Sequence, residues 1–167
     1  MSENQNTADR DDFIHAMRDV ACSVTVVTTD GENGRHGATV SAFCSVSADP
    51  PTLLVCLKAD SKIAEVVGAN AKFNVNVLDA SLPNVALRFS GAQDPNVADR
   101  FDGIDTVEPD VLAGSRVFEC DVKDIHRSGS HNIILGHVRG IRGGISEPLV
   151  YLNGQFRKMA QPDLGDE

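Results

Sequence analysis

The feature that most constrains the fold is a succession of short segments rich in β-branched and aliphatic residues, each closed by a turn signal. Such segments predict strands. We expect strands at residues 22–29, 36–46, 52–58, 72–78, 117–126, 132–141, 149–152 and 155–157. The last two flank Asn153-Gly154, a dipeptide typical of a tight hairpin. Because the strands do not alternate regularly with helices, the sequence predicts a mainly β domain with short helices, arranged as a barrel and not as a doubly wound sheet.

Three short helices are expected between the strands. Apolar residues at helical spacing follow an acidic pair near the N-terminus and predict the first helix: Phe13, Met17, Val20 and Ala21. Ser61 is a suitable N-cap for a helix over residues 62–67, with Gly68 at its C-terminal end. A third helix is expected over residues 83–89, followed by an exposed excursion over residues 91–105.

Length, composition and charge limit the class of protein. With 167 residues, the chain is expected to form one domain at residues 12–159, between flexible ends at 1–11 and 160–167. No apolar run reaches the roughly 18–20 residues of a membrane helix, and the N-terminal segment does not resemble a secretory signal, so we expect a cytoplasmic protein without a membrane partner. The net charge of −9 argues against binding to nucleic acid.

Several kinds of site are excluded by the residues that would have to carry them. The five histidines lack metal-ligand spacing, so no metal site is expected. The GxSxG, GxGxxG and Walker motifs are missing, so a bound dinucleotide is not held in the Rossmann or P-loop manner. The cysteines are widely spaced among apolar neighbours and are expected to be buried, reduced thiols: Cys22, Cys44, Cys56 and Cys120.

Hydroxyl-bearing and small residues alternate along residues 37–47. In a strand, this spacing places Thr39, Ser41 and Ser45 on one face with Phe43. A face of small polar side chains lets a planar heterocycle approach the backbone, while hydroxyls and amides bond to its edge. A solvated strand face would produce the same pattern, so both interpretations remain open.

Three further places could take part in binding. Ser61 and Lys62 open a predicted helix, where free amides and an ammonium suit a phosphate, although a simple cap with a solvated lysine is the alternative. Residues 88–91 offer another cation and flexible amides. His131 follows a Ser-Gly-Ser turn at a strand start, where its ring can face a pocket, and a structural histidine is the alternative.

The order of several short motifs resembles one family. These motifs are FIHAM at 13–17, VTVVTT at 24–29, GATVSAF at 37–43 with SVS at 45–47 and Pro50-Pro51, NVNVL at 74–78, RFSG at 88–91, RF at 100–101, GSH at 129–131, GHV at 136–138 and PLVY at 148–151. Together they resemble the short flavin reductases built on the FMN-binding split barrel, which supply reduced flavin to two-component monooxygenases and have corrinoid reductase relatives.

The resemblance implies a role for each matched site. It implies flavin contacts from Thr39, Val40, Ser41, Ala42, Cys56, Leu57 and Lys58, and phosphate or ribityl contacts from Ser61, Lys62, Arg88, Phe89, Ser90 and Gly91. It places His131 near the nicotinamide as the catalytic-site histidine. It also implies a homodimer with FMN or FAD at the interface, NADH or NADPH as the electron donor, and a monooxygenase as a possible partner. Hydride passes directly from nicotinamide to flavin, so no acid–base machinery is required.

Three positions depart from the family pattern, and several questions stay open. Ile14 stands where the family usually has Arg, Ser23 where it has Gly, and Ser130 where it has an Asp beside the histidine. A corrinoid reductase, a non-catalytic flavin-binding protein and an unrelated β-barrel binding protein are the alternatives. The choice between FMN and FAD, the choice between NADH and NADPH, the electron acceptor, and the role of flavin as substrate or prosthetic group are not readable from these residues.

Overall fold

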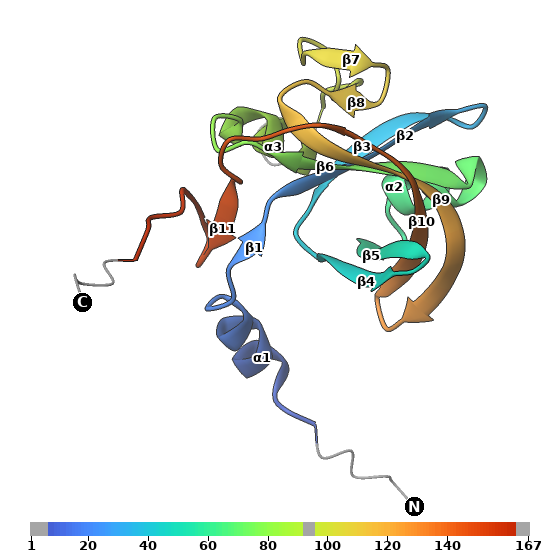
Figure 1. Ribbon diagram of the computed structural model, residues 1–167. Coiled ribbons are helices and arrows are strands. Elements are labelled where there is room, and N and C mark those ends of the chain that lie inside the picture. The colour runs from blue at the N-terminus through green and yellow to red at the C-terminus, as the bar shows by residue number, and fades with distance from the viewer. Residues whose placement is uncertain (1–6, 92–95, 163–167) are drawn as a thin grey trace, which may run out of the picture.

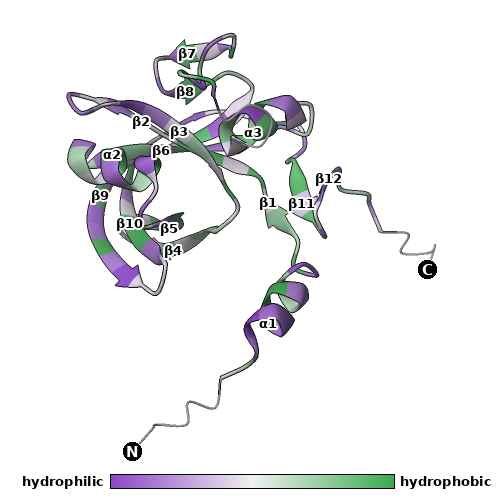
Figure 2. Ribbon diagram, turned by 180° about the vertical axis from the view of Figure 1, so that it is seen from behind, coloured by the Kyte–Doolittle hydropathy of each residue, from purple (hydrophilic) through white to green (hydrophobic). Residues whose placement is uncertain are grey.

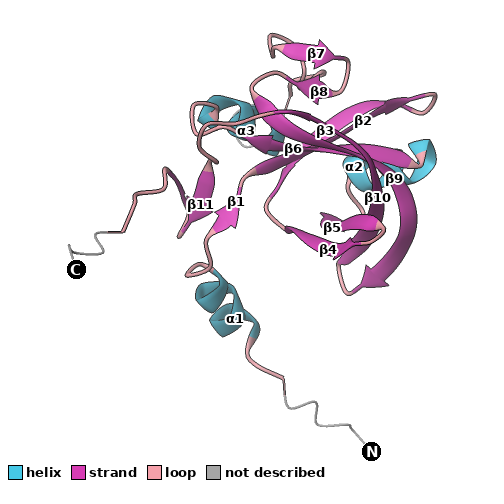
Figure 3. Ribbon diagram, in the orientation of Figure 1, coloured by secondary structure: helices cyan, strands magenta, loops and turns pink. Residues whose placement is uncertain are grey.

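The computed structural model describes residues 7–91 and 96–162 and is built around one strongly curved antiparallel sheet (Figures 1 and 3). Among the described residues this sheet has seven strands. In spatial order they are β3 (Gly34–Val40), β2 (Thr25–Gly31), β6 (Lys72–Leu78), β9 (Ser115–Ser128), β10 (His131–Gly143), β5 (Pro51–Lys58) and β4 (Phe43–Ala48). The expectation of a mainly β fold with short helices is therefore confirmed.

The sheet curls on itself but does not close into a barrel. Its two edges, β3 and β4, are separated in sequence only by Ser41 and Ala42. The backbone N–H of Cys56 on β5 donates to the carbonyl of Ala42 at 3.0 Å, so the linking segment rests against the far side of the sheet. The sheet is open between β3 and β4, and cavities lie along the end of β3 and the Ser41-Ala42 link.

The expectation of one continuous strand over residues 36–46 is wrong, because the chain changes from one sheet edge to the other at Ser41-Ala42. As a result, the predicted common face of Thr39, Ser41, Ser45 and Phe43 does not exist. Phe43 packs against the hydrophobic core from β4, and Ser45 on the same strand is exposed.

The strand expected at 22–29 is likewise divided. β1 (Cys22–Ser23) pairs with β11 (Val150–Leu152), and β11 pairs with β12 (Gln155–Arg157), giving a small second sheet. The hairpin at Asn153-Gly154 is confirmed, and both residues have positive φ angles of 50° and 77°. A hairpin of β7 (Thr106–Glu108) and β8 (Val111–Leu112) was not expected.

Two helices pack against the curved sheet. α2 (Lys62–Asn70) begins at the N-cap Ser61, as predicted, but continues past Gly68 to a left-handed Ala71. Gly68 is therefore a helical residue and does not terminate the helix. α3 (Pro83–Ser90) ends at a left-handed Gly91.

Two groups of buried side chains form the core. One lies between α2 and the sheet and includes Val55, Leu57, Val67, Phe73 and Ile134; the other lies under α3 and includes Val26, Leu78, Phe89, Phe101 and Leu149. Each fully buried side chain of this size stabilises the fold by about 1.5–3 kcal/mol. The second group fixes α3 beside β3, which shapes one side of the opening.

α1 (Arg10–Met17) projects away from the sheet (Figures 1 and 2). Its start lies ahead of the boundary expected at residue 12, and Asp9 caps it by accepting from the N–H groups of Asp11 and Asp12. None of its residues is buried, although Ile14 and Met17 are apolar. Within the described part of the chain, no helix has the length and apolar character needed to span a membrane.

Candidate functional site

A cavity of about 300 Å³ lies at the opening of the sheet. We call it the His131 cavity, and its lining residues are Ala38, Thr39, Val40, Ser41, Ala42, Cys56, Leu57, Lys58, Ser61, Ile63 and His131. The cavity thus brings together the end of β3, the end of β5, the start of α2 and the start of β10. Of the residues predicted for the site, it collects the polar strand segment, the β5 segment, Ser61 and His131.

Strand register explains why His131 reaches this cavity. β10 pairs antiparallel with β5, and His131 lies opposite Lys58. The N–H of Ala59 donates to the carbonyl of Ser130 at 2.9 Å, which fixes the β9–β10 turn beside the end of β5. Gly129 in this turn has a φ of 55°, a conformation that glycine adopts without strain.

The side chain of Ser130 contacts His131 directly. Its Oγ lies 2.9 Å from Nδ1 of the ring, and both residues are exposed. A hydroxyl can donate to an unprotonated Nδ1 or accept from a protonated one, so it orients the ring without supplying charge. This is the position at which the family pattern has a carboxylate.

The two residues at the start of α2 are already engaged. The hydroxyl of Ser61 donates to the carbonyl of Lys58 at 2.5 Å and accepts weakly from the N–H of Ala64 at 3.4 Å. The ammonium of Lys62 lies 3.1 Å from both carboxylate oxygens of Glu65. Lys62 is exposed and does not line the His131 cavity.

A second cavity of about 420 Å³ lies on the other side of the β3 end. It is lined by Val24, Thr39, Val40, Ser41, Ala86, Leu87, Ser90, Tyr151, Gly154 and Phe156. The hydroxyl of Thr39 donates to the carbonyl of Ala86 at 2.6 Å, which ties β3 to α3 between the two cavities. Thr39 therefore supports the wall, and its proton is not available to a ligand.

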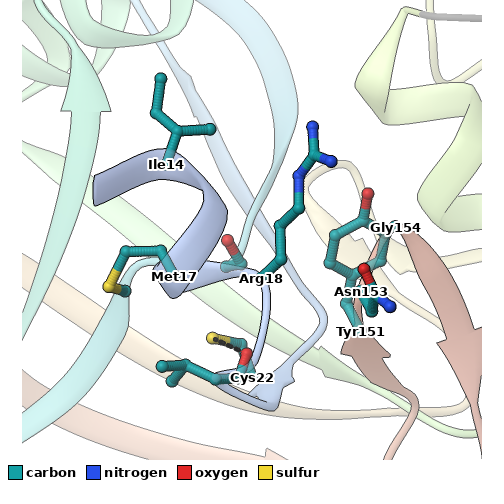
Figure 4. Close-up of a pocket in the computed structure, with 9 residues that line it drawn as sticks. Ile14, Met17, Arg18, Cys22, Tyr151, Asn153 and Gly154 are labelled. Atoms are coloured by element: carbon teal, nitrogen blue, oxygen red, sulfur yellow. Dashed lines mark hydrogen bonds between the residues drawn. The ribbon is translucent and has the colours of Figure 1, made fainter. Parts of the chain in front are cut away.

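A third cavity of about 330 Å³ separates α1 from the tip of the β11–β12 hairpin (Figure 4). Ile14 and Met17 form one side, while Tyr151 and Asn153 form the other, with Arg18 between them (Figure 4). Ser41 lines this cavity as well as the other two. Ser41 is consequently the point at which the three cavities adjoin.

The four residues at 88–91 lie apart from the His131 cavity. Arg88 donates to the carbonyl of Asp102 at 2.9 Å, and Phe89 is buried edge-on against Phe101, with ring centroids 4.9 Å apart. Ser90 lines the second cavity, and Gly91 lies beside the guanidinium of Arg100.

Arg35, His36 and Arg100 were missed as site candidates. Together with Gly37 they line a fourth cavity at the far end of β3. Burial lowers the pKa of His36, and the charges of Arg100 and Lys62 lower it further. The sequence signal that could have indicated this group is the RF pair at 100–101, which belongs to the motifs of the family resemblance.

The cysteines are free thiols, but they are not uniformly buried. Cys44 is exposed, Cys22 and Cys56 are half-buried, and only Cys120 is buried, where desolvation raises its pKa to about 12. The expectation of four buried cysteines is wrong, and Cys44 is exposed because it lies on the edge strand β4. No cluster of three or more metal-ligating side chains exists in residues 7–91 and 96–162.

Comparisons with known proteins agree on one family. The family model described as "Flavin reductase like domain" matches residues 17–160. The "FMN reductase (NADH) RutF 2" of Methylorubrum extorquens (strain PA1) is 37% identical over 158 residues, covering 90% of each chain. The structure of "NADH:FAD oxidoreductase SgcE6 in complex with NAD and FAD fragments" from Streptomyces globisporus C-1027 superposes with a TM-score of 0.82 at 30% identity, covering 94% of this chain and 96% of that one.

A further solved structure is the "Styrene Monooxygenase Flavin Reductase (SMOB)" from Pseudomonas putida S12. It has a TM-score of 0.77 at 25% identity, covering 90% of this chain and 99% of that one.

Proposed function

Because this chain belongs to the flavin reductase-like family, we propose that it is an NADH-dependent flavin reductase that transfers hydride from the nicotinamide to FMN or FAD. The observation that carries the proposal is the His131 cavity at the open side of the sheet. It combines small residues at the end of β3 with the hydroxyl of Ser41 on the β3–β4 link, residues 56–58 of β5 and one histidine.

The residues of this cavity fit a flavin. A planar ring system needs apolar surface on its faces and polar groups at its edge. Val40 and Leu57 supply the apolar surface, while Ser41 and the backbone of the β3–β4 link supply the polar groups. Small side chains at Ala38 and Ala42 let the ring approach the backbone. Ser61 and Lys62 are proposed to face the ribityl phosphate end, and residues 88–91 remain a prediction from the family pattern.

When bound, the flavin accepts the hydride and so supplies the redox chemistry itself. This chain's residues bind and orient. Alignment of the two rings accounts for most of what a protein can add to such a step. His131, held by Ser130, positions the nicotinamide at the mouth of the cavity. A side-chain proton transfer is not part of the hydride step.

We further propose that the reduced flavin serves a separate monooxygenase, and that the active form is a homodimer. Relatives described as monooxygenase flavin reductases support the first point. The exposed apolar residues of α1 support the second, because a chain of this size seldom leaves a large apolar face in water. A cytoplasmic location stays a prediction.

The test is NADH oxidation followed at its absorbance maximum, with and without added flavin. We expect the rate to rise with FMN or FAD and to saturate. A rate that stays unchanged when flavin is added would contradict the proposal. Tight flavin binding without NADH turnover would indicate a non-catalytic flavin protein, and faster turnover with a cob(II)yrinate derivative than with free flavin would indicate a corrinoid reductase.

A further inference from the structure

The fourth cavity, of about 370 Å³, lies along the first residues of β3. We call it the Arg35 cavity, and it is lined by Arg35, His36, Gly37, Val97, Ala98, Asp99, Arg100 and Phe101. The first three residues directly precede Ala38–Val40 of the His131 cavity on the same edge strand. At about 3.3 Å per residue, Arg35 and Ser41 lie about 20 Å apart along the extended chain.

The lining of the Arg35 cavity holds two arginines, Arg35 and Arg100, against one acidic residue, Asp99, although the whole chain carries a net charge of −9. Arg100 donates through Nη1 to the carbonyls of Gly37 and Phe89, at 3.2 and 2.8 Å. Within residues 7–91 and 96–162, both of its hydrogen bonds use Nη1, so Nε and Nη2 remain as donors. Such a group of donors suits a phosphate.

A flat stacking surface lies beside these cations. The guanidinium of Arg35 lies over the ring of Phe101, 4.4 Å from its centroid, and that ring is itself fixed edge-on against Phe89. Asp99 accepts from Nη2 of Arg35 at 2.7 Å and holds the plane in place. The Arg35 side chain is 34% exposed, so its outer face is accessible. A planar guanidinium is a suitable surface for a purine base.

We propose that the Arg35 cavity binds an adenosine 5′-phosphate group, the portion that FAD and NADH share and FMN lacks. Arg100 binds the phosphate, and Arg35 stacks on the base. The inference rests on the proposed function, since FAD and NADH are the dinucleotides of that reaction. It assigns to β3 a second binding role beyond the flavin ring.

The experiment measures three quantities on the full chain. Adenosine monophosphate binding is measured by calorimetry, with inorganic phosphate as the reference ligand. Dissociation constants for FAD and FMN are measured by fluorescence quenching. The Michaelis constant for NADH is measured with riboflavin as acceptor, because riboflavin carries neither phosphate nor adenosine. NADH oxidation with riboflavin also tests the proposed function by itself, so its failure is distinguishable from a failure of the adenylate assignment.

Two variants and one control separate the contributions. Arg100→Gln removes the phosphate contact, and Arg35→Lys keeps the charge and removes the plane. The control is Arg139→Gln, an exposed arginine on β10 paired with Asp121 at 3.2 Å. Loss of a charge-assisted hydrogen bond should weaken adenosine monophosphate binding about tenfold to a hundredfold in Arg100→Gln. Arg35→Lys should weaken it several-fold, and the control should not change it.

The outcomes identify the source of the group. If FAD binds more tightly than FMN and the two variants remove that difference, the cavity holds the adenylate of FAD. If FAD and FMN bind alike and the variants raise only the Michaelis constant for NADH, it holds the adenylate of NADH. Equal losses for FMN and FAD would mean that Arg100 contacts the flavin's own phosphate and would overturn the assignment. Adenosine monophosphate binding no tighter than inorganic phosphate, or unchanged in both variants, would also overturn it.

Discussion

We propose that the pair Ser130 and His131 positions the nicotinamide for hydride transfer. The serine hydroxyl lies 2.9 Å from Nδ1 of the ring, so the ring is oriented by a neutral partner. In this proposal the oriented ring holds the amide end of the nicotinamide in place.

We predict that His131→Ala raises the Michaelis constant for NADH and slows flavin reduction by about one to two orders of magnitude, the effect of a misaligned donor. Flavin affinity should be nearly unchanged. Stopped-flow reduction and flavin titration measure the two quantities. His126→Ala is the matched control, because that histidine is exposed on β9 and pairs with Asp124. Complete loss of reduction in His131→Ala, together with loss of a wild-type pH dependence near 6–7, would show instead that His131 is a general base or acid.

The carboxylate of Asp79 links two segments of the chain through hydrogen bonds that depend on its ionised form. Its carboxylate accepts from the backbone N–H and hydroxyl of Ser81 and of Ser146, which joins the end of β6 to the segment before β11. These hydrogen bonds hold the pKa of Asp79 well below its usual range. A depressed carboxylate pKa stabilises the fold above the unfolded-state pKa of about 3.9, and this stabilisation is lost as the pH falls below it.

We therefore predict that Asp79→Asn lowers the midpoint of thermal unfolding at pH 7. The difference between the midpoints of the wild type and the variant should become smaller as the pH falls below about 4. Thermal unfolding of both proteins from pH 3 to pH 7 measures the effect. Asp60→Asn is a suitable control, since Asp60 is exposed and pairs only loosely with Lys58 at 3.5 Å. A gap between Asp79→Asn and wild type that does not depend on pH would contradict the role given to Asp79.

At the scale of elements, the prediction of one strand over residues 36–46 is wrong, although residues 38–42 do line a cavity together. Alternation along a segment cannot reveal that its two halves pair with different partners, here β2 for residues 34–40 and β5 for residues 43–48. The hairpin at Asn153-Gly154 was predictable because its turn chemistry is local. The β7–β8 hairpin was not, because side chains distant in sequence hold it.

Those distant side chains surround Asn76 on β6. Its Nδ2 donates to the carbonyl of Val26 and to Oγ1 of Thr28, each at 2.9 Å, and its Oδ1 accepts from the N–H of Leu112 at 3.0 Å. Asn76 is fully buried. This one amide thus links β2 and β6 to β8.

We predict that Asn76→Ala destabilises the protein by about 2–4 kcal/mol, because buried partners are left without hydrogen bonds. Hydrogen exchange should increase first at β8 if the amide anchors that hairpin. Chemical denaturation and amide exchange measure the two effects, with the exposed Gln155→Ala as control. A loss of stability below about 0.5 kcal/mol would contradict this prediction, because it would mean that the hydrogen bonds of Asn76 contribute little to the fold.

At the scale of the whole molecule, α1 projects away from the sheet (Figure 1) and lines one of the three cavities that Ser41 also lines (Figure 4). α1 carries Phe13 and Met17, which are 60% and 47% exposed. Burial of one large apolar side chain stabilises a structure by about 1.5–3 kcal/mol. A helix whose apolar side chains stay in water lacks this stabilisation. A second copy that covers α1 would bury these residues and close the third cavity.

We predict a dimer in solution that Met17→Glu converts to monomer, because a carboxylate cannot be buried at an apolar contact without a large cost. Light scattering after size-exclusion chromatography at micromolar concentration measures the mass, and circular dichroism checks that the variant is folded. Val107→Glu is the matched control, since Val107 is 70% exposed on β7, away from α1 (Figure 1). If the cavities depend on the second copy, the Met17→Glu monomer should also bind flavin less tightly, whereas the Val107→Glu protein should not. A wild-type monomer, or a Met17→Glu protein that stays dimeric, would contradict the placement of the interface on α1.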